Sequence, residues 1–451
     1  MTVATQQELV ERIWERDGTV WTGSDEDRWL GWLDEPKRMR ERAGEIVEFA
    51  TRARSGFDTF VLLGMGGSSL APEVLKRTFG AQQLHVLDTT HPAMIRHAEK
   101  SLDLSKTMFI VSSKSGGTLE TLSHFEYFWE KTGGHGDQFI AITDPGSSLE
   151  QLAKARGMRV FAGEPTIGGR YSALSPFGIV PAALMAIDIE RLLEGGERMA
   201  EACRRQANPG LQLGLQLGER WREGRDKVCI TETEGNFGLW AEQLIAESTG
   251  KQGRGLVPAP GESPDGPDRQ PADVQLGDPL EIGAEFFRWE FAVAVAGAIL
   301  EINPFDQPDV QAAKDKTKEV LSSGEDPRPE PAGSLDELLA RAEPPNYIGI
   351  QAFIDPMRER ELQSLIDRGH KTGCVVTHGL GPRYLHSTGQ LHKGGPPTGL
   401  FVQVVDDTGE EIPIPGQDFG FGRLIRAQAE GDYRSLRERG RSIVRVRLED
   451  L

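Results

Sequence analysis

The segment TMFIVSSKSGGTLETLSHFEYFWEK, residues 107–131, decides the fold class of this chain. It opens with an apolar run that predicts a buried β-strand, turns through serines, glycines and one lysine, and continues with the apolar spacing of an α-helix. The same order recurs in residues 57–79 and 137–157, and a further strand is predicted in residues 83–90. Strands that alternate with helices predict a parallel sheet covered by helices, with the turns at its ligand-binding edge.

The second half of the chain predicts another unit of the same kind. A helical region around residues 173–222 is followed by a strand and a helix in residues 226–251, and later by strands in residues 347–353, 373–379 and 399–405. The pattern therefore predicts an α/β fold class with two related domains, each a mainly parallel sheet flanked by helices. The expected boundaries are residues 1–50 for an N-terminal helical segment, 51–222 for the first domain and 223–451 for the second.

Two stretches of the second half break this alternation. Residues 285–302, EFFRWEFAVAVAGAILEI, are apolar on all sides and predict a buried helix. Residues 257–275 are rich in proline, glycine and aspartate and are expected to form a long loop.

Composition and charge restrict the function classes. The chain has 451 residues, 38% hydrophobic and 27% charged, which is typical of a soluble globular protein with several domains. No apolar run approaches the roughly 18 residues of a membrane span, the N-terminal residues lack a signal-peptide core, and three scattered cysteines indicate a reducing cytoplasmic setting without a metal site. The net charge of −18 disfavours nucleic acid as a partner but permits a small phosphorylated substrate held by local cations.

A glycine turn follows the strand in residues 57–79. Gly66, Gly67 and Ser68 stand where backbone amides at a helix start can face an anion. Glycine turns after strands are common, so this motif alone leaves a structural turn and a binding turn equally open.

The turn within residues 107–131 carries the stronger signal. Ser113, Ser115 and Thr118 place three hydroxyls around Lys114. A helix N-cap would use one of these hydroxyls, so the full set favours a phosphate site over capping alone.

Arg170 and Glu247 are candidates for chemistry. Arg170 follows two glycines before an apolar helix, a setting that suits oxyanion stabilisation better than the solvated surface where most arginines lie. Gln243 and Glu247 are four residues apart and share one helical face. From spacing alone, Glu247 could be either a solvated surface acid or a catalytic base. The neighbouring Glu242 is expected to be solvated.

The last candidates lie in the final third of the chain. Gln307 and Lys314 are seven residues apart, about two helical turns, so they can share a face. His386 and His392 lie in a segment rich in glycine and hydroxyl groups, without other metal ligands nearby. Isolated lysines are mostly surface groups, and isolated histidines are mostly structural. A functional role for these residues is therefore supported only by the other motifs.

Together the motifs SKSGGTLET, GGRYS, ESTGK and NPFDQPDVQAAK resemble those of the phosphoglucose isomerase family, which is built from two sugar-isomerase (SIS) domains. The resemblance runs from about residue 57 to the end of the sequence and is closest to the isomerase portion of transaldolase–phosphoglucose isomerase fusion proteins. It implies two SIS-type domains and no cofactor. The residues it implies for catalysis are Glu247, Arg170, His386 and Lys314, and those for substrate and phosphate are Gly66, Gly67, Ser68, Ser113, Lys114, Ser115, Thr118, Gln243 and Gln307.

The chain departs from the family pattern at two places. Gly117 occupies a position where threonine is commoner, which removes one hydroxyl from the phosphate loop. The HSTGQL stretch that begins at His386 resembles a histidine motif that classical members carry before the lysine motif, whereas here it follows Lys314. The choice between His386 and His392 therefore stays open at this stage.

The activity implied by the resemblance is glucose-6-phosphate isomerase, in glycolysis and gluconeogenesis. Alternatives are a dual phosphoglucose/phosphomannose isomerase and a non-catalytic SIS protein that senses sugar phosphates. A sensor is expected to lack Glu247 and Arg170 and often carries a basic DNA-binding helix, so catalysis is favoured. Family members are often dimers, which implies a homodimer, and the resemblance leaves a functional link to a separate transaldolase open.

Overall fold

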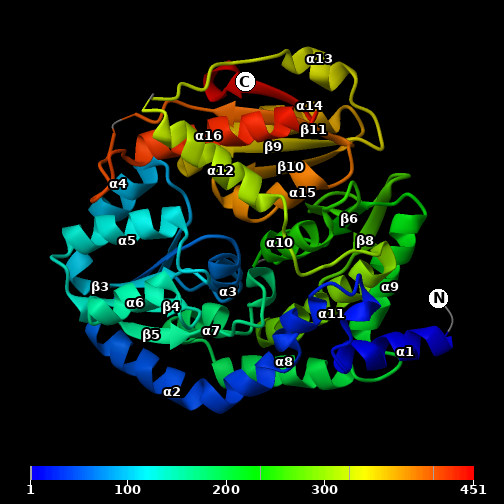
Figure 1. Ribbon diagram of the computed structural model, residues 1–451, viewed down its shortest axis with the longest axis horizontal. Helices are drawn as coiled ribbons and strands as arrows, with labels where there is room; N and C mark the ends of the chain where they lie inside the picture. The colour runs from blue at the N-terminus through cyan, green and yellow to red at the C-terminus, as the bar shows by residue number, and fades with distance from the viewer. Residues whose placement is uncertain (1–2, 234, 325, 410) are drawn as a thin grey trace.

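The computed structural model describes the backbone of residues 3–233, 235–324, 326–409 and 411–451, with the side chains of residues 3, 4 and 310–314 outside that description. Within this part of the chain, three parallel sheets are surrounded by helices (Figure 1), which confirms the predicted α/β class. None of the helices described is both long and apolar enough to cross a membrane.

The first sheet is formed by the strand–turn–helix units of the N-terminal half. Its strand order is β2-β1-β3-β4-β5, and all neighbouring pairs are parallel. β5 falls in a stretch for which the pattern predicted no strand. The five strands are β1 (Thr59–Gly64), β2 (Leu84–Leu87), β3 (Thr107–Ser112), β4 (Phe139–Thr143) and β5 (Arg159–Ala162).

Helices cover both faces of this sheet, because successive side chains of each buried strand point to opposite faces. Leu62 and Ile110 belong to a core shared with α2 (Glu35–Gly56), α3 (Leu70–Thr78) and α7 (Pro176–Leu184). Their sequence neighbours on the other face form a separate core with α5 (Leu119–Lys131) and α6 (Ser148–Ala155). The turns after β1 and β3 are thereby held at the carboxyl edge of the sheet.

The second half of the chain contains two smaller parallel sheets. One has the order β10-β9-β11-β12 and the other the order β7-β6-β8. Val257 of β7 and Val375 of β10 belong to one apolar cluster, so the two sheets lie side by side at these strands. The strands are β6 (Lys227–Ile230), β7 (Val257–Pro260), β8 (Arg269–Ala272), β9 (Tyr347–Phe353), β10 (Val375–Leu380), β11 (Gly399–Val405) and β12 (Ser442–Arg447).

The loop expected in residues 257–275 is a wrong prediction, because β7 and β8 both lie within it. Each of these strands pairs with β6 alone, on opposite sides. Proline lacks a backbone N–H and is tolerated where one edge of a strand needs no ladder hydrogen bond. A four-residue edge strand can therefore contain the prolines that argued for a loop.

The predicted buried helix is α11 (Ile282–Leu300), nearly all of whose residues are shielded from solvent. It packs against α8 (Ile189–Ala202) and α9 (Pro209–Arg222). On α9, a Cβ atom at Gly214 would come within 2.5 Å of the carbonyl oxygen of Ala292, so glycine there permits the close contact. α11 fixes the start of the loop that leads to α12 (Val310–Ser322).

A central helix, α10 (Gly238–Thr249), joins the parts of the molecule. Figure 1 shows it between the first sheet, the three-stranded sheet and the four-stranded sheet. It packs against α3, α11, β7 and α15 (Gly389–Gly394). Side chains on different faces of α10 therefore reach different parts of the interior.

Candidate functional site

Most of the predicted site residues line one cleft of about 470 Å³. The cleft lies where the turns after β1 and β3 meet α10 and two short 3₁₀ helices, η7 (Gly169–Tyr171) and η10 (Arg383–His386). Trp29, Phe305 and Asp306 also line it. The predicted residues in its lining are Gly66, Gly67, Ser68, Lys114, Ser115, Thr118, Arg170, Gln243, Glu247, Gln307 and His386.

The hydroxyl-rich loop lies at one end of this cleft. Thr118 occupies the N-cap position of α5, yet its side chain makes no capping hydrogen bond. Its Oγ1 instead lies 2.9 Å from Oγ of Ser113, which is buried and does not line the cleft. Ser113 thus orients Thr118, whose hydroxyl lines the cleft together with that of the exposed Ser115.

Lys114 lines the cleft with its charge already balanced. Its Nζ lies 2.7 and 2.6 Å from the two carboxylate oxygens of Asp144 and donates to the carbonyl oxygen of Glu164 at 2.8 Å. Burial lowers the pKa of Lys114, and the Asp144 carboxylate opposes that shift. Asp144 is a site residue that the sequence reasoning missed, because 30 residues separate it from Lys114.

Arg170 is held rigidly behind the cleft. Its side chain is only 2% exposed, so every N–H group must find a partner inside the protein. Nε donates to Oγ of Ser248 at 2.8 Å, and Nη2 donates to the carbonyl oxygens of Pro304 and Asp306 at 2.7 and 2.9 Å. The remaining nitrogen, Nη1, points to the cleft residues.

Glu247 meets that nitrogen. Its Oε2 lies 3.6 Å from Arg170 Nη1 and accepts a hydrogen bond of 3.1 Å from Nε2 of Gln243, one helical turn earlier on α10. Arg170 Nη1 also donates to Oε1 of Gln307 at 3.2 Å. Glu247 is buried, so the surface-acid alternative is wrong, and a carboxylate, a guanidinium and two amides converge at one point of the cleft.

His386 reaches the cleft from η10. The carbonyl oxygen of His386 accepts a hydrogen bond of 2.8 Å from Gln243, and its ring Nε2 lies 2.9 Å from Oε1 of Glu120. The same Glu120 oxygen accepts from Nε2 of Gln428 at 2.8 Å. His392 lies elsewhere: it is buried, its Nδ1 is 3.0 Å from Gln351, and burial lowers its pKa well below the usual value. The geometry therefore favours His386 over His392.

Lys314 belongs to α12, but its side chain is outside the part of the chain that the structure describes. Its proposed role stays a prediction from the resemblance. Gln307, seven residues earlier, precedes the helix instead of sharing a face of it.

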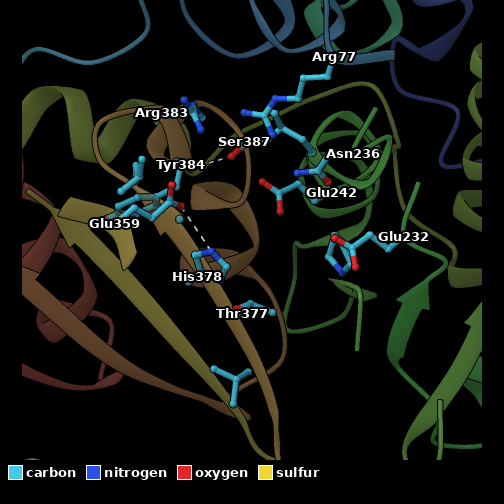
Figure 2. A pocket seen from close by; sticks show the side chains of 15 residues that line it. Arg77, Glu232, Asn236, Glu242, Glu359, Thr377, His378, Arg383, Tyr384 and Ser387 are labelled. Carbon is cyan, nitrogen blue, oxygen red and sulfur yellow. Dashed lines mark hydrogen bonds and ion pairs between the residues drawn. The ribbon is translucent and has the colours of Figure 1, made fainter. Parts of the chain in front are cut away.

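Glu242 contradicts the expectation of a solvated acid. It is half-buried and lines a separate pocket of about 200 Å³ on another face of α10 (Figure 2). Burial raises the pKa of Glu242 to about 7, opposed by the charges of His378 and Arg383. The pattern of α10 gave no sign of this pocket, because its other walls come from β10 and η10.

The cleft suits proton transfer next to a bound anion. A carboxylate whose position is fixed by two neighbours can act as a general base, and a buried guanidinium beside it can stabilise developing negative charge. The hydroxyls of Ser115 and Thr118 lie in the same cleft and can hold an anionic group of the ligand. Within the described residues, three or more His, Cys, Asp or Glu side chains nowhere form a group that could hold a metal ion.

Comparisons with known proteins show what part of this chain is similar to. Residues 36–211 match the family model of phosphoglucose isomerase. The glucose-6-phosphate isomerase of Carboxydothermus hydrogenoformans is 34% identical over 248 residues, which are 49% of this chain and 53% of that protein. A glucose-6-phosphate isomerase of Thermus thermophilus is 33% identical over 265 residues, which are 55% of this chain and 62% of that protein. The chain thus spans little more than half the length of the curated relatives it matches.

A solved structure extends the likeness at the level of the fold. The glucose-6-phosphate isomerase from Chlamydia trachomatis superposes with a TM-score of 0.61 at 19% identity, covering 71% of this chain and 85% of that one. The sequence match over residues 36–211 and these relatives show that this part of the chain is similar to phosphoglucose isomerases.

Proposed function

We propose that this chain is a glucose-6-phosphate isomerase, which interconverts glucose 6-phosphate and fructose 6-phosphate through a cis-enediol(ate) intermediate. The observation that carries the proposal is the convergence of Glu247, Arg170 and His386 in one cleft with the hydroxyls of Ser115 and Thr118. The names of the relatives support the same activity.

In the proposed reaction Glu247 moves a proton between C1 and C2 of the open-chain sugar. The proton leaves a carbon beside a carbonyl, and the electron pair moves onto the carbonyl oxygen to give the enediolate. Arg170 Nη1, 3.6 Å from the base, stabilises that negative charge. A proton also passes from the O2 hydroxyl to O1, and Glu247 returns its proton to the neighbouring carbon, so the aldose becomes the ketose without a redox partner or cofactor.

Ring opening is assigned to His386 and Lys314, which would carry protons to and from the ring oxygen. Glu120 faces Nε2 of His386 at 2.9 Å and can hold the imidazole in one orientation. The phosphate would lie against Ser115 and Thr118, with Gly66, Gly67 and Ser68 on the neighbouring turn. Binding of the phosphate then orients the reacting carbons toward Glu247.

The decisive experiment is a coupled isomerase assay on the purified chain with glucose, mannose and fructose 6-phosphates. Turnover of the glucose and fructose esters alone is the expected result. Additional turnover of mannose 6-phosphate would support the dual phosphoglucose/phosphomannose alternative. Thermal stabilisation by the esters without turnover would indicate a sugar-phosphate sensor and would refute catalysis.

The cellular setting follows from the proposed activity. A glycolytic and gluconeogenic isomerase acts in the cytoplasm, where its phosphorylated substrates occur. The proposals of a homodimer and of a functional link to a separate transaldolase rest on the family resemblance alone.

A further inference from the structure

The loop of residues 303–309 carries Gln307 into the cleft and connects α11 to α12. Its position decides whether Gln307 meets Arg170. The side-chain amide of Asn303 stabilises a turn at the start of this loop. Its Oδ1 atom accepts hydrogen bonds from the backbone N–H groups of Phe305 and Asp306, at 2.9 and 3.3 Å. This turn directs the carbonyl oxygens of the loop inward.

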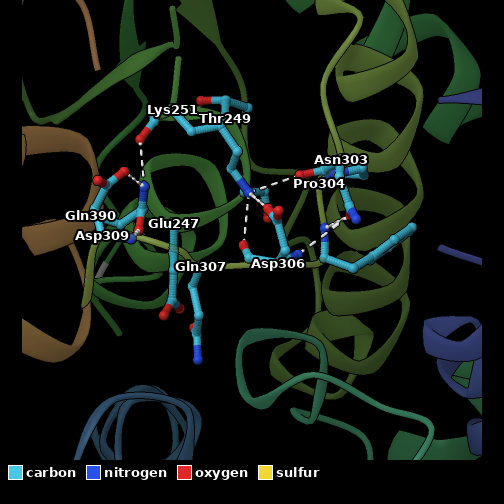
Figure 3. Close-up of polar contacts among 12 residues, drawn as sticks. Glu247, Thr249, Lys251, Asn303, Pro304, Asp306, Gln307, Asp309 and Gln390 are labelled. Carbon is cyan, nitrogen blue, oxygen red and sulfur yellow. Dashed lines mark hydrogen bonds and ion pairs between the residues drawn. The ribbon is translucent and has the colours of Figure 1, made fainter. Parts of the chain in front are cut away.

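A buried lysine donates hydrogen bonds to these carbonyl oxygens. Lys251 follows the C-terminal end of α10, and its side chain is only 1% exposed. Nζ donates to the carbonyl oxygens of Asn303 and Asp306, both at 2.7 Å, and to Oδ1 of Asp306 at 2.5 Å (Figure 3). An ammonium group has three N–H donors, and all three are used on this loop.

Arg170 holds the same loop from the cleft side. Its Nη2 donates to the carbonyl oxygens of Pro304 and Asp306, so the Asp306 carbonyl is shared between Arg170 and Lys251. The two cations reach the loop from η7 and from the end of α10. Lys251 does not line the cleft, and its hydrogen bonds to residues 303–309 connect it to the cleft residue Gln307.

We propose that Lys251 is a positioning residue whose ammonium group clamps residues 303–309 and thereby keeps Gln307 against Arg170 and beside Glu247. The expected effect on turnover rests on the proposed isomerase activity. The hydrogen bonds between Lys251 and the loop do not depend on that activity and can be tested without it.

The clamp is sensitive to pH within an accessible range. Burial lowers the pKa of Lys251 to about 8, and the charge of Arg170 adds to this, whereas Asp306 and Glu247 oppose it. Asp25 also faces the loop, bound to Nδ2 of Asn303 at 2.9 Å. A neutral amine has two N–H donors and no charge, so one hydrogen bond and the attraction to Asp306 are lost as the pH rises through about 8.

The test compares kcat and KM of three variants between pH 7 and pH 10. In the wild type, kcat should fall at pH 9 to roughly a tenth of its value at pH 7, as expected for a required proton with a pKa near 8. Lys251→Arg retains the charge, so this alkaline fall should disappear. Asp306→Asn removes a group that raises the pKa of Lys251, so the fall should move to lower pH. Lys227→Arg is the matched control, because Lys227 is also a fully buried lysine but pairs with Asp226.

Amide hydrogen exchange of residues 303–309 provides a second readout that needs no activity. After correction for intrinsic exchange, the amides of Phe305 and Asp306 should lose protection between pH 7 and pH 9 in the wild type and in Lys227→Arg, but not in Lys251→Arg. If the wild type shows no isomerase activity, the proposed function fails while the exchange data still decide the clamp. An alkaline fall and an exchange pattern that are the same in all four proteins would overturn the proposal.

Discussion

Two carboxylates on α10, Glu242 and Glu247, have the same chemistry and different surroundings. Glu247 lies in the cleft, fixed by Gln243 and close to Arg170. Glu242 faces the other pocket, where it has no hydrogen-bond or ion-pair partner within the described chain, and its pKa is raised to about 7. The sequence alone could not predict which of the two faces the cleft. Both lie on an apolar helix, and the segments that pack against this helix are distant in the chain.

This pair provides the sharpest test of the proposed base. Glu247→Gln keeps the size of the side chain and removes the proton acceptor, so kcat should fall by roughly 10²–10⁴-fold with KM nearly unchanged. Glu242→Gln is the control one turn away, and it should retain turnover. Near-normal steady-state kinetics of Glu247→Gln would exclude Glu247 as the base.

A substitution in the phosphate loop, residues 113–118, is expected to increase the affinity for the sugar phosphate. A Cβ atom at Gly117 would meet no atom within 4 Å, and Gly117 does not have a positive φ. Gly117→Thr restores the commoner family residue, and one more hydrogen bond to a charged group, worth about 1.5 kcal/mol or more, should lower KM by at least roughly ten-fold. KM for fructose 6-phosphate and the thermal shift with that ligand would measure this.

The adjacent Gly116 is the natural comparison for that variant. Its φ is +73°, and a Cβ atom there would lie 2.8 Å from Cβ of Ser147. Gly116→Ala should therefore destabilise the loop and raise KM. An equal effect of both substitutions would mean that the loop does not hold the phosphate.

At the scale of elements, the repeated strand–turn–helix pattern was enough to predict the first sheet, because each unit is local in sequence. β7 and β8 could not be predicted in the same way. Their prolines are acceptable only because each strand pairs on one side, and that pairing with β6 is decided by the rest of the fold. Figure 1 shows β6 and β8 next to α10.

α11 carries an acid that makes stability depend on pH. Glu290 is buried, and its Oε1 has no hydrogen-bond partner among the described residues. Burial and the nearby Glu35 raise its pKa well above the usual value. Between the unfolded pKa of about 4.5 and the folded pKa, the native state holds a proton that the unfolded state has released, so stability falls as the pH rises.

Glu290→Gln should remove that loss. We expect the free energy of unfolding of the variant to rise relative to the wild type as the pH increases above about 5, by at most about 1.4 kcal/mol per pH unit. Urea unfolding at three pH values would measure the slope. A difference between the two proteins that does not change with pH would contradict the protonated state of Glu290.

At the scale of the whole molecule, the site is assembled from segments that are far apart in the chain. Glu120 and His386 are 266 residues apart, and Arg170 and Gln307 are 137 apart. The motif resemblance named most of the cleft residues, but no local pattern predicts that Glu120 faces His386 or that Asp144 neutralises Lys114. These partners are set by the packing of the second half of the chain against the first sheet.

One ion pair fixes that packing next to the cleft. Arg383 of η10 donates from Nε and Nη2 to the two oxygens of Asp88, at 2.7 and 2.9 Å, immediately after β2. Asp88→Asn should destabilise the protein by about 1–2 kcal/mol, because the half-buried guanidinium of Arg383 loses its bidentate anion. It should also raise KM, since η10 carries His386.

A double-mutant cycle with Arg383→Met separates the pair from its surroundings. The double variant should lose less stability than the sum of the two single variants, as measured by urea unfolding. Glu48→Gln, at an exposed i,i+4 pair with Arg52 on α2, is the control and should change stability little. Simple additivity at Asp88 and Arg383 would show that the contact does not hold η10.

The hydrogen-bond partners of Arg170 are synthesised long after Arg170 itself. The carbonyl oxygens that satisfy its guanidinium lie 134 and 136 residues further along the chain, at Pro304 and Asp306. A ribosome that adds about 5–20 residues per second needs roughly 7–27 s to synthesise that interval. During this time all strands of the first sheet and Arg170 of η7 have been synthesised, but the two carbonyl partners of Arg170 have not. We therefore expect Arg170 to gain these two hydrogen bonds only after residues 303–309 have left the exit tunnel.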